Sequence, residues 1–170
     1  MKKFRIACAA ATLCLCMGAS AQKKYPQPII AENADVFGYA YDRDKKQLVL
    51  NYIYESAGEF EASVGQAIVG LNGHYAVIDV GGHEVLEAIY DDIIFNPDHQ
   101  TYTVTINGKS GVIDCQGRQV LPIKFDNLGA TTKGWYEGML DGEWIYAASD
   151  GRVTSDMSEY LKWREASQKE

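Results

Sequence analysis

Apolar and polar side chains alternate along TYTVTIN, residues 101–107, where tyrosine, valine and isoleucine are separated by threonine. A period of two places the apolar side chains on one face of a β-strand and the threonines on the other. The strand ends at Asn107-Gly108, a pair that tolerates the positive φ angles of a type I′ hairpin turn. A return strand, SGVID, leads to a second turn with Asp114 in its first position and Gly117 in its fourth. The pattern predicts two linked hairpins, or three antiparallel strands in a meander.

The same pattern recurs along the chain. Residues 69–93 align without gaps with residues 104–128, at an offset of 35. A third copy, residues 138–153, follows at an offset of 34, and a fainter copy precedes the others at residues 38–54. A single unit cannot bury its own apolar face, so the copies must pack against one another. We therefore expect an all-β fold, an antiparallel meander of three to four β-hairpin repeats of about 35 residues with about ten strands in all.

Glycine, asparagine and aspartate mark the turns of each copy. Asparagine and glycine tolerate left-handed backbone, and an aspartate side chain accepts a bond from a nearby turn N–H. We assign structural turn roles to Asn72, Gly73, Asp79, Gly82, Asn107, Gly108, Asp114, Gly117, Gly142 and Gly151.

One of these turns looks like part of a phosphate-binding loop, because Gly108-Lys109-Ser110 matches the end of that motif. The motif also requires a glycine where this chain has Thr103, and a helix directly after the loop. Strand and turn follow instead, and the position of Lys109 holds His74 in the preceding copy and Glu143 in the next. We expect an exposed turn exit and no nucleotide site.

The C-terminal segment changes to helical spacing. Asp156 is placed to cap a helix, with Glu159 three residues later to complete a capping box. We expect a short helix within residues 156–170 that closes the open end of the sheet. The alternative is a helix that binds a partner.

These motifs resemble the WG-repeat family, in which a turn such as Asn-Gly-Lys is followed by Trp-Gly, two apolar residues, Asp and a Gly turn. The resemblance covers residues 60–155, and one copy carries it as Asn107, Gly108, Lys109, Gly111, Val112, Ile113, Asp114 and Gly117. The namesake tryptophan is replaced by Tyr75 in one copy and by Ser110 in the next, and it is kept only as Trp144. The resemblance implies an all-β repeat module, common in secreted bacterial proteins, and brings no catalytic residues.

The N-terminus predicts export. Three basic residues precede an apolar run of twelve residues, and Ala19-Ser20-Ala21 is a signal-peptidase site. The run is shorter than the roughly 20 residues that cross a bilayer, so we expect no membrane span. We divide the chain into a signal peptide (1–21), an extended segment (22–35), the repeat domain (36–155) and the C-terminal helix (156–170). The expected location is periplasmic or extracellular.

The net charge limits the classes of partner, and the cysteine content limits the possible disulfides. The net charge of the chain is −7, and removal of the three basic residues of the signal peptide moves it to −10. Such a chain is poorly suited to nucleic acid or to an anionic membrane surface. Cys115 is the one cysteine beyond the signal peptide, and we expect a free surface thiol.

Candidate chemistry is sparse. His74, His83 and His99 are expected at turns and loops, with His74 and His83 at opposite ends of a strand, too far apart for one ion. We expect no metal and no cofactor, although weak calcium binding at turn aspartates stays open. An alternative function is a carboxylate-dependent hydrolase acting on a glycan or peptidoglycan, with acids drawn from Asp91, Asp92 and Asp126 near Trp135.

Aromatic residues supply the candidate binding surface. In GWYEG, residues 134–138, Trp135 and Tyr136 point to opposite faces, and Tyr136 aligns with a core tyrosine, so we expect Trp135 to be exposed. The tentative binding residues are Trp135, Tyr136 and Trp144, although packing within the core would also explain them. The sequence predicts a secreted non-catalytic repeat module of the bacterial envelope that binds an unknown protein or a cell-surface glycan.

Overall fold

The computed structural model describes residues 24–31, 35–42, 44, 47–132 and 134–167. The expected signal peptide lies outside these residues. Within the described residues the fold is all-β, with fifteen strands in four antiparallel sheets and one C-terminal helix.

Each sheet is a meander of strands that are consecutive in the chain. The first sheet contains β1 (Gln27–Ile30), β2 (Phe37–Ala40) and β3 (Leu48–Tyr54). The second contains β4 (Ser56–Ala57), β5 (Gln66–Leu71), β6 (His74–Asp79) and β7 (Glu84–Tyr90). The third contains β8 (Asp92–Asn96), β9 (Thr101–Ile106), β10 (Lys109–Asp114) and β11 (Gln119–Phe125). The fourth contains β12 (Asn127–Ala130), β13 (Trp135–Leu140), β14 (Glu143–Ala148) and β15 (Val153–Thr154), and α1 (Met157–Ser167) follows.

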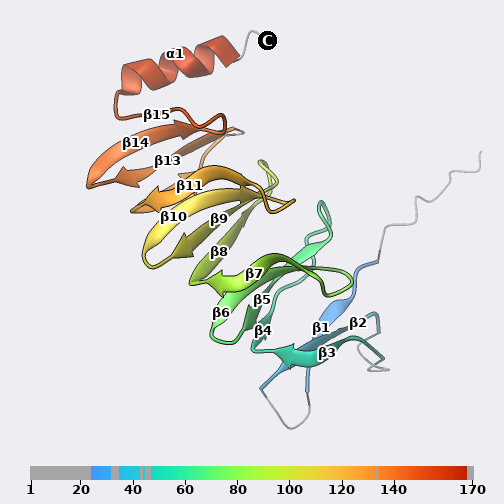
Figure 1. The fold of residues 1–170 in the computed structure, drawn as a ribbon. Coiled ribbons are helices and arrows are strands. Elements are labelled where there is room, and N and C mark those ends of the chain that lie inside the picture. The colour runs from blue at the N-terminus through green and yellow to red at the C-terminus, as the bar shows by residue number, and fades with distance from the viewer. Residues whose placement is uncertain (1–23, 32–34, 43, 45–46, 133, 168–170) are drawn as a thin grey trace, which may run out of the picture.

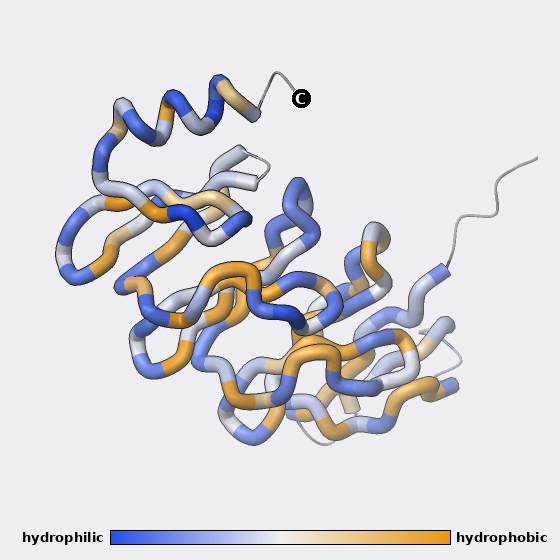
Figure 2. Tube along the Cα trace, turned by 45° about the horizontal axis from the view of Figure 1, so that its top comes forward, coloured by the Kyte–Doolittle hydropathy of each residue, from blue (hydrophilic) through white to orange (hydrophobic). Residues whose placement is uncertain are grey.

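The sheets follow one another in a single stack, and α1 lies beyond the fourth sheet (Figure 1). A separate apolar core fills each interface. Tyr39 of the first sheet packs against Val69 of the second, and Val77 of the second packs against Val104 of the third. Val112 and Tyr136 belong to the core between the third and fourth sheets. Apolar segments therefore recur from sheet to sheet in the hydropathy view of the described residues (Figure 2).

The pairing register repeats from sheet to sheet. In each of the first three sheets the next-to-last strand pairs with the last, through Phe37–Tyr54 in the first sheet, Tyr75–Tyr90 in the second and Ser110–Phe125 in the third. Two register shifts follow at matching places in all three pairs. Gly111 lies beside the bulge of the third sheet, where an added Cβ would come 2.8 Å from the backbone of Ile123. The first sheet is thus a true copy of the unit that lacks its first strand.

The central hairpin of each complete unit closes with the expected turn. Asn107 and Gly108 have φ angles of 51° and 72°, and the corresponding pairs Asn72-Gly73 and Asp141-Gly142 have the same signs. Positive φ at both central residues is the type I′ geometry that matches the twist of the flanking strands.

The structure corrects three details of the sequence prediction. Complete units contain four strands rather than three, because a short first strand precedes each central hairpin. The fifteen strands therefore exceed the ten that the sequence indicates. Alternation in β9 does separate Tyr102 and Val104 from the threonines, but Thr101 and Thr103 are also buried, since another sheet covers that face. Asn96 donates its side-chain amide to Thr103 Oγ1 at 3.0 Å and so satisfies this polar face.

The C-terminal helix covers the end of the stack. The ring of Tyr160 stacks on Tyr146 at 4.4 Å and meets Trp135 edge-on at 5.4 Å. Asp156 caps the helix, because its Oδ1 accepts a bond from the Ser158 N–H at 2.8 Å. The expected capping box does not form, since Glu159 accepts the hydroxyl of Thr154 instead, and Thr154 Oγ1 accepts the Asp156 N–H.

Gly108→Val tests the hairpin turn. Nothing lies within 4 Å of a Cβ added at Gly108, so the cost comes from the positive φ alone. We expect it to lower the free energy of unfolding by about 1 kcal/mol or more in chemical denaturation. Gly129→Val is the control, because Gly129 lies in a strand without a positive φ and its Cβ would meet only an ordinary contact at 3.9 Å. Equal stability of the two variants would contradict the assigned turn.

Candidate functional site

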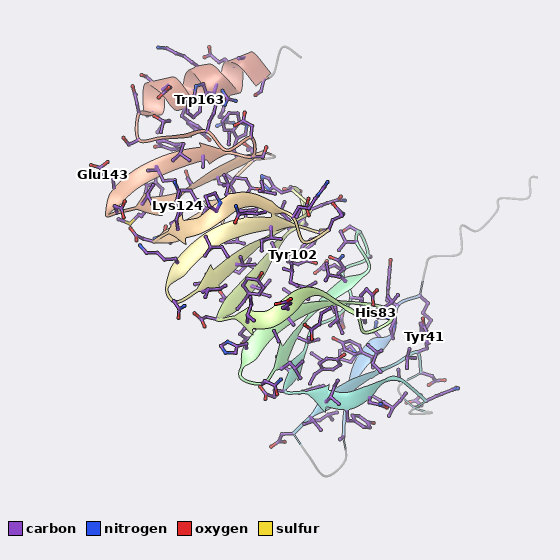
Figure 3. All side chains as sticks on the ribbon, viewed as in Figure 1. Tyr41, His83, Tyr102, Lys124, Glu143 and Trp163 are labelled. Carbon is purple, nitrogen blue, oxygen red and sulfur yellow. The ribbon has the colours of Figure 1, made fainter. Side chains whose placement is uncertain are left out.

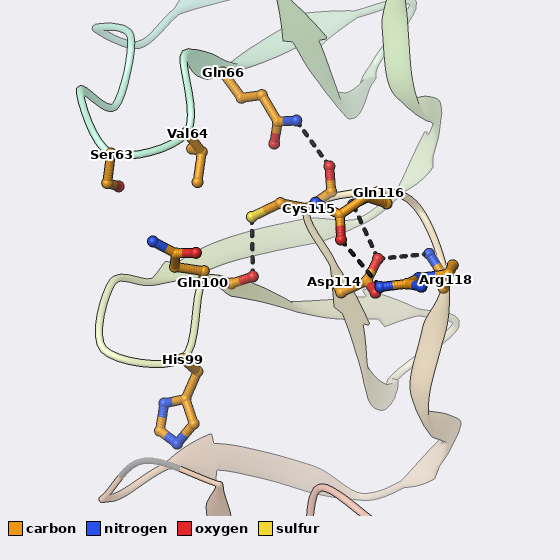
Figure 4. A pocket seen from close by; sticks show the side chains of 9 residues that line it. All are labelled: Ser63, Val64, Gln66, His99, Gln100, Asp114, Cys115, Gln116 and Arg118. Carbon is orange, nitrogen blue, oxygen red and sulfur yellow. Dashed lines mark hydrogen bonds and ion pairs between the residues drawn. The ribbon is translucent and has the colours of Figure 1, made fainter.

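A polar hollow of about 420 Å³ opens where the loops of the second and third sheets meet. Three segments line it: residues 63–66 before and within β5, the turn at residues 99–100, and the turn at residues 114–118. Figure 4 shows these side chains converging from the two sheets. The hollow thus lies between repeat units rather than inside one.

Asp114 organises the turn on one side of the hollow. Its Oδ1 accepts the backbone N–H groups of Gln116 and Arg118, each at 2.9 Å, and its Oδ2 accepts Arg118 Nε at 2.7 Å. Burial alone would raise the pKa of Asp114, but these bonds and the positive charge of Arg118 hold it below its usual value. A carboxylate in this setting stays ionised and is a poor proton donor.

Gln66 connects the two sheets across the hollow. Its Nε2 donates to the carbonyl oxygen of Cys115 at 2.8 Å, and its Oε1 accepts the hydroxyl of Tyr102 at 2.9 Å. The next interface repeats this tyrosine contact, because the Tyr136 hydroxyl lies 3.3 Å from Thr101 Oγ1. Thr101 aligns with Gln66, so one tyrosine per unit reaches back to the same position of the preceding unit. The alternation of apolar and polar residues within one strand does not predict these tyrosine hydrogen bonds, because they join different units.

Cys115 is buried, and the expectation of a surface thiol is wrong. Its side chain is 6% exposed, and Sγ lies 2.9 Å from the carbonyl oxygen of Gln100, to which the thiol donates. Burial raises the pKa of the thiol, and the charge of Asp114 raises it further. A neutral, enclosed thiol is a weak nucleophile, so Cys115 contributes packing at this interface.

Acids at the junctions between units bind the hairpin turns. Asp91, between the second and third sheets, accepts the Asn107 N–H at 2.6 Å. Asp126, one unit later, accepts the Gly142 N–H at 3.0 Å and also pairs with Lys109. Glu55 accepts the Gly73 N–H at 2.9 Å in the second sheet. The side-chain bond from Lys109 is the main cause of the lowered pKa of Asp126. These recurring contacts explain why the chain repeats an acid at this position.

Asp126 and Trp135, two of the residues named for the hydrolase alternative, lie toward opposite ends of β13. The backbone N–H of Asp126 donates to the carbonyl oxygen of Met139, near the C-terminal end of β13. Trp135 is the first residue of that strand. Four residues of strand separate the two ends by about 13 Å at about 3.3 Å per residue. The polar hollow is lined by one carboxylate, that of Asp114.

The aromatic candidates divide into buried and exposed residues. Trp135 is 8% exposed and Tyr136 is 1% exposed, so the expected exposure of Trp135 is wrong. The helix α1 covers the face of β13 that would otherwise present Trp135 to solvent, as its contact with Tyr160 shows. Trp144, in contrast, is 51% exposed.

Trp144 shares its place in the repeat with Tyr75. The two residues occupy the position of the namesake tryptophan in the fourth and second sheets, and Tyr75 is 39% exposed. The intervening unit has the smaller Ser110 there, buried and 3.1 Å from the hydroxyl of Thr105. A hollow of about 250 Å³ adjoins Tyr75 and is lined also by Glu55 and His74. The sequence alignment could have indicated Tyr75, because it places Tyr75 in register with Trp144.

The histidines lie at turns and loops. His83 Nδ1 is 3.1 Å from Asp79 Oδ2, and Asp79 donates its N–H to the His83 carbonyl across the turn. His74 Nδ1 lies 3.8 Å from Asp91, because the register shift in the β6–β7 pairing places Tyr75 opposite Tyr90. His99 Nε2 donates to the Thr132 carbonyl oxygen at 2.8 Å. His83, at the turn between β6 and β7, is labelled among the side chains of Figure 3. Within the described residues, no three His, Cys, Asp or Glu side chains are grouped in a way that could hold a metal ion.

Comparison with known families agrees with this architecture. The family model for the WG containing repeat matches residues 111–144, which run from β10 to the start of β14. Over these residues the chain is similar to the WG repeat. No curated protein and no solved structure shows a significant match. In the part of the chain that the structure describes, no helix is long and apolar enough to cross a membrane.

Asp114→Ala tests the turn beside the hollow. Loss of two backbone hydrogen bonds should reduce the free energy of unfolding at pH 7 by about 1–2 kcal/mol. The folded protein lowers the pKa of Asp114, so its contribution is complete above the unfolded pKa, near pH 4, and is lost as the pH falls through the lower folded value. Denaturant melts from pH 7 to pH 3 should therefore show the gap between wild type and variant narrowing below about pH 4.

The control for this comparison is Asp92→Ala, which removes an exposed acid at the start of β8. A gap that stays constant down to pH 3, or an equal loss in the control, would contradict the role assigned to the Asp114 carboxylate.

Proposed function

We propose that this protein is a secreted, non-catalytic binding module of the bacterial envelope, whose partner is a protein or a cell-surface glycan. One observation carries the binding part of the proposal. Trp144 and Tyr75 are exposed at the same position of the repeat, two units apart, whereas the other large aromatic side chains of the described residues are buried or half-buried, except for Tyr41, which lies outside this position. Secretion rests on the basic and apolar N-terminus and on the Ala-x-Ala site.

The spacing of the two rings favours an extended ligand. Packed sheets lie about 10 Å apart, so equivalent positions two units apart are separated by about 20 Å. Aromatic faces pack against the apolar faces of sugar rings or of side chains while their polar edges stay wet. The junction acids Glu55 and Asp91 lie near this row and offer acceptors to hydroxyl or amide donors. A neutral linear glycan fits these groups best, because the net charge of the chain disfavours an anionic polymer.

The hydrolase alternative has weaker support. A glycosidase needs two facing carboxyl groups about 5–10 Å apart, one of them with a raised pKa. The pKa of Asp126 is lowered by Lys109, and Asp91 is engaged with a backbone N–H. The buried Trp135 lies at the other end of its strand and offers no sugar platform.

Binding of the purified protein to envelope polysaccharide tests the proposal. We expect Trp144 fluorescence to change on titration with neutral cell-surface oligosaccharides. Trp144→Ala and Tyr75→Ala should each weaken retention on isolated cell-wall glycan by about tenfold or more, as loss of a stacking aromatic does at other interfaces. Ile94→Ala is the control, because Ile94 is 55% exposed but lies outside the aromatic row.

Retention on envelope proteins but not on glycan, with the same sensitivity to Trp144→Ala, would assign the partner to the protein class. Equal retention of all three variants would contradict the aromatic row as the binding surface. Release of reducing sugars by the wild-type protein would contradict the non-catalytic assignment.

A further inference from the structure

The last strands of the first three units are equivalent edges of the stack. These strands are β3 (LVLNYIY), β7 (EVLEAIY) and β11 (QVLPIKF), and each forms the outer edge of its sheet. Their pairing registers match, and the first, fourth and sixth residues are exposed in all three strands. The second residue is exposed in β3 alone. The three strands can therefore be compared position by position.

Two of the three edges carry features that oppose pairing with another chain. In β7 the exposed positions include Glu84 and Glu87. In β11 the position of Glu87 is taken by Pro122, which has no N–H to donate, and Lys124 follows two residues later. Charges and proline on an edge strand discourage the addition of a further strand. The edges on the opposite side of the stack, β1, β4, β8 and β12, have at most five residues each.

The edge of β3 has neither charge nor proline, and of such features it shares with β7 and β11 only the two register shifts of its pairing. Its exposed positions hold Leu48, Val49, Asn51 and Ile53, and the strand contains neither a charged residue nor proline. Ile53 is 54% exposed and Val49 is 41% exposed. An uncharged, apolar edge of seven residues is a template for addition of a strand. β3 lies in the sheet farthest from α1 in the stack (Figure 1).

We propose that β3 pairs with β3 of a second copy of this chain, antiparallel and centred on Asn51. In this register Asn51 faces Asn51 of the partner subunit, and Val49 faces the partner's Ile53. A two-fold axis through Asn51 makes each contact occur twice and closes the assembly as a dimer. The two three-stranded sheets then become one continuous sheet of six strands.

Three observations favour a second copy over another occupant. The apolar pattern of β3 is symmetric about its central Asn51, so the strand is its own complement, with a β-branched residue opposite a β-branched residue. The chain carries a net charge of −7, but no like charges meet along this uncharged strand. A hollow of about 350 Å³, lined by Tyr41, Leu48 and Val49 among others, lies at the end of β3 where the partner's Ile53 arrives.

The dimer buries little surface beyond one pair of strands. Stable protein interfaces bury about 1,200–2,000 Å² in total, so pairing of two seven-residue strands belongs to the weak class. We expect dimer formation at micromolar protein concentrations rather than a permanent complex.

Cysteine cross-linking tests the register. Residues directly opposite each other in an antiparallel pair have Cα atoms about 4.5–5.5 Å apart, within disulfide range. Asn51→Cys should therefore give a covalent dimer on oxidation with glutathione disulfide. Glu87→Cys, the equivalent position of β7, is the matched control and should stay monomeric under the same conditions. The native Cys115 is buried and should not cross-link.

Sedimentation equilibrium tests the association itself. We expect the wild-type protein to show a monomer–dimer equilibrium, and Ile53→Lys, which copies Lys124, to weaken it by tenfold or more. Ile89→Lys, at the equivalent position of β7, should leave it unchanged. A monomer at all concentrations, or a dimer that is unaffected by Ile53→Lys and not cross-linked through Asn51→Cys, would overturn the proposal.

Discussion

Burial of apolar faces between neighbouring sheets is the constraint on which this structure depends. A sheet of three or four short strands has two apolar faces and no core of its own, so it is stable only between neighbours. Each interface contains its own cluster, such as Val77 with Val104 and Val112 with Tyr136. The repeat length near 35 residues follows, because it returns the chain to the same place on the next sheet.

Polar contacts fix the register of the stack. Junction acids bind the turn N–H groups of the next hairpin, and tyrosines reach back to the preceding unit. The two ends of the stack differ. The helix covers the fourth sheet through Tyr160, whereas the first sheet presents the uncharged edge of β3. One covered end and one end with an uncharged edge strand fit the proposed weak dimer through β3.

Much of the fold could be predicted from the sequence because its turns require residues that tolerate positive φ angles. The turns at Asn107-Gly108 and Asp114 can be predicted from the sequence because few residues accept the dihedral angles they require. The spacing between successive copies of these turns gives the length of the repeat unit. Burial was harder to predict. Alternation distinguishes the two faces of a strand but does not say that both are covered, so Trp135 was expected to be exposed, yet α1 buries it. Cys115 lies in a turn, and the loops of two sheets enclose it, which no local signal reveals.

Removal of one complete unit tests the central claim most directly. Deletion of residues 91–125 joins Tyr90 to Asp126, which then takes the place of Asp91, and brings the second sheet against the fourth. If each sheet depends only on the face of its neighbour, the shortened chain should unfold cooperatively and keep a β-rich circular dichroism spectrum. Deletion of residues 91–120, which breaks the register, should leave it unfolded or aggregated. An in-register deletion that fails to fold, or two deletions that behave alike, would contradict the account.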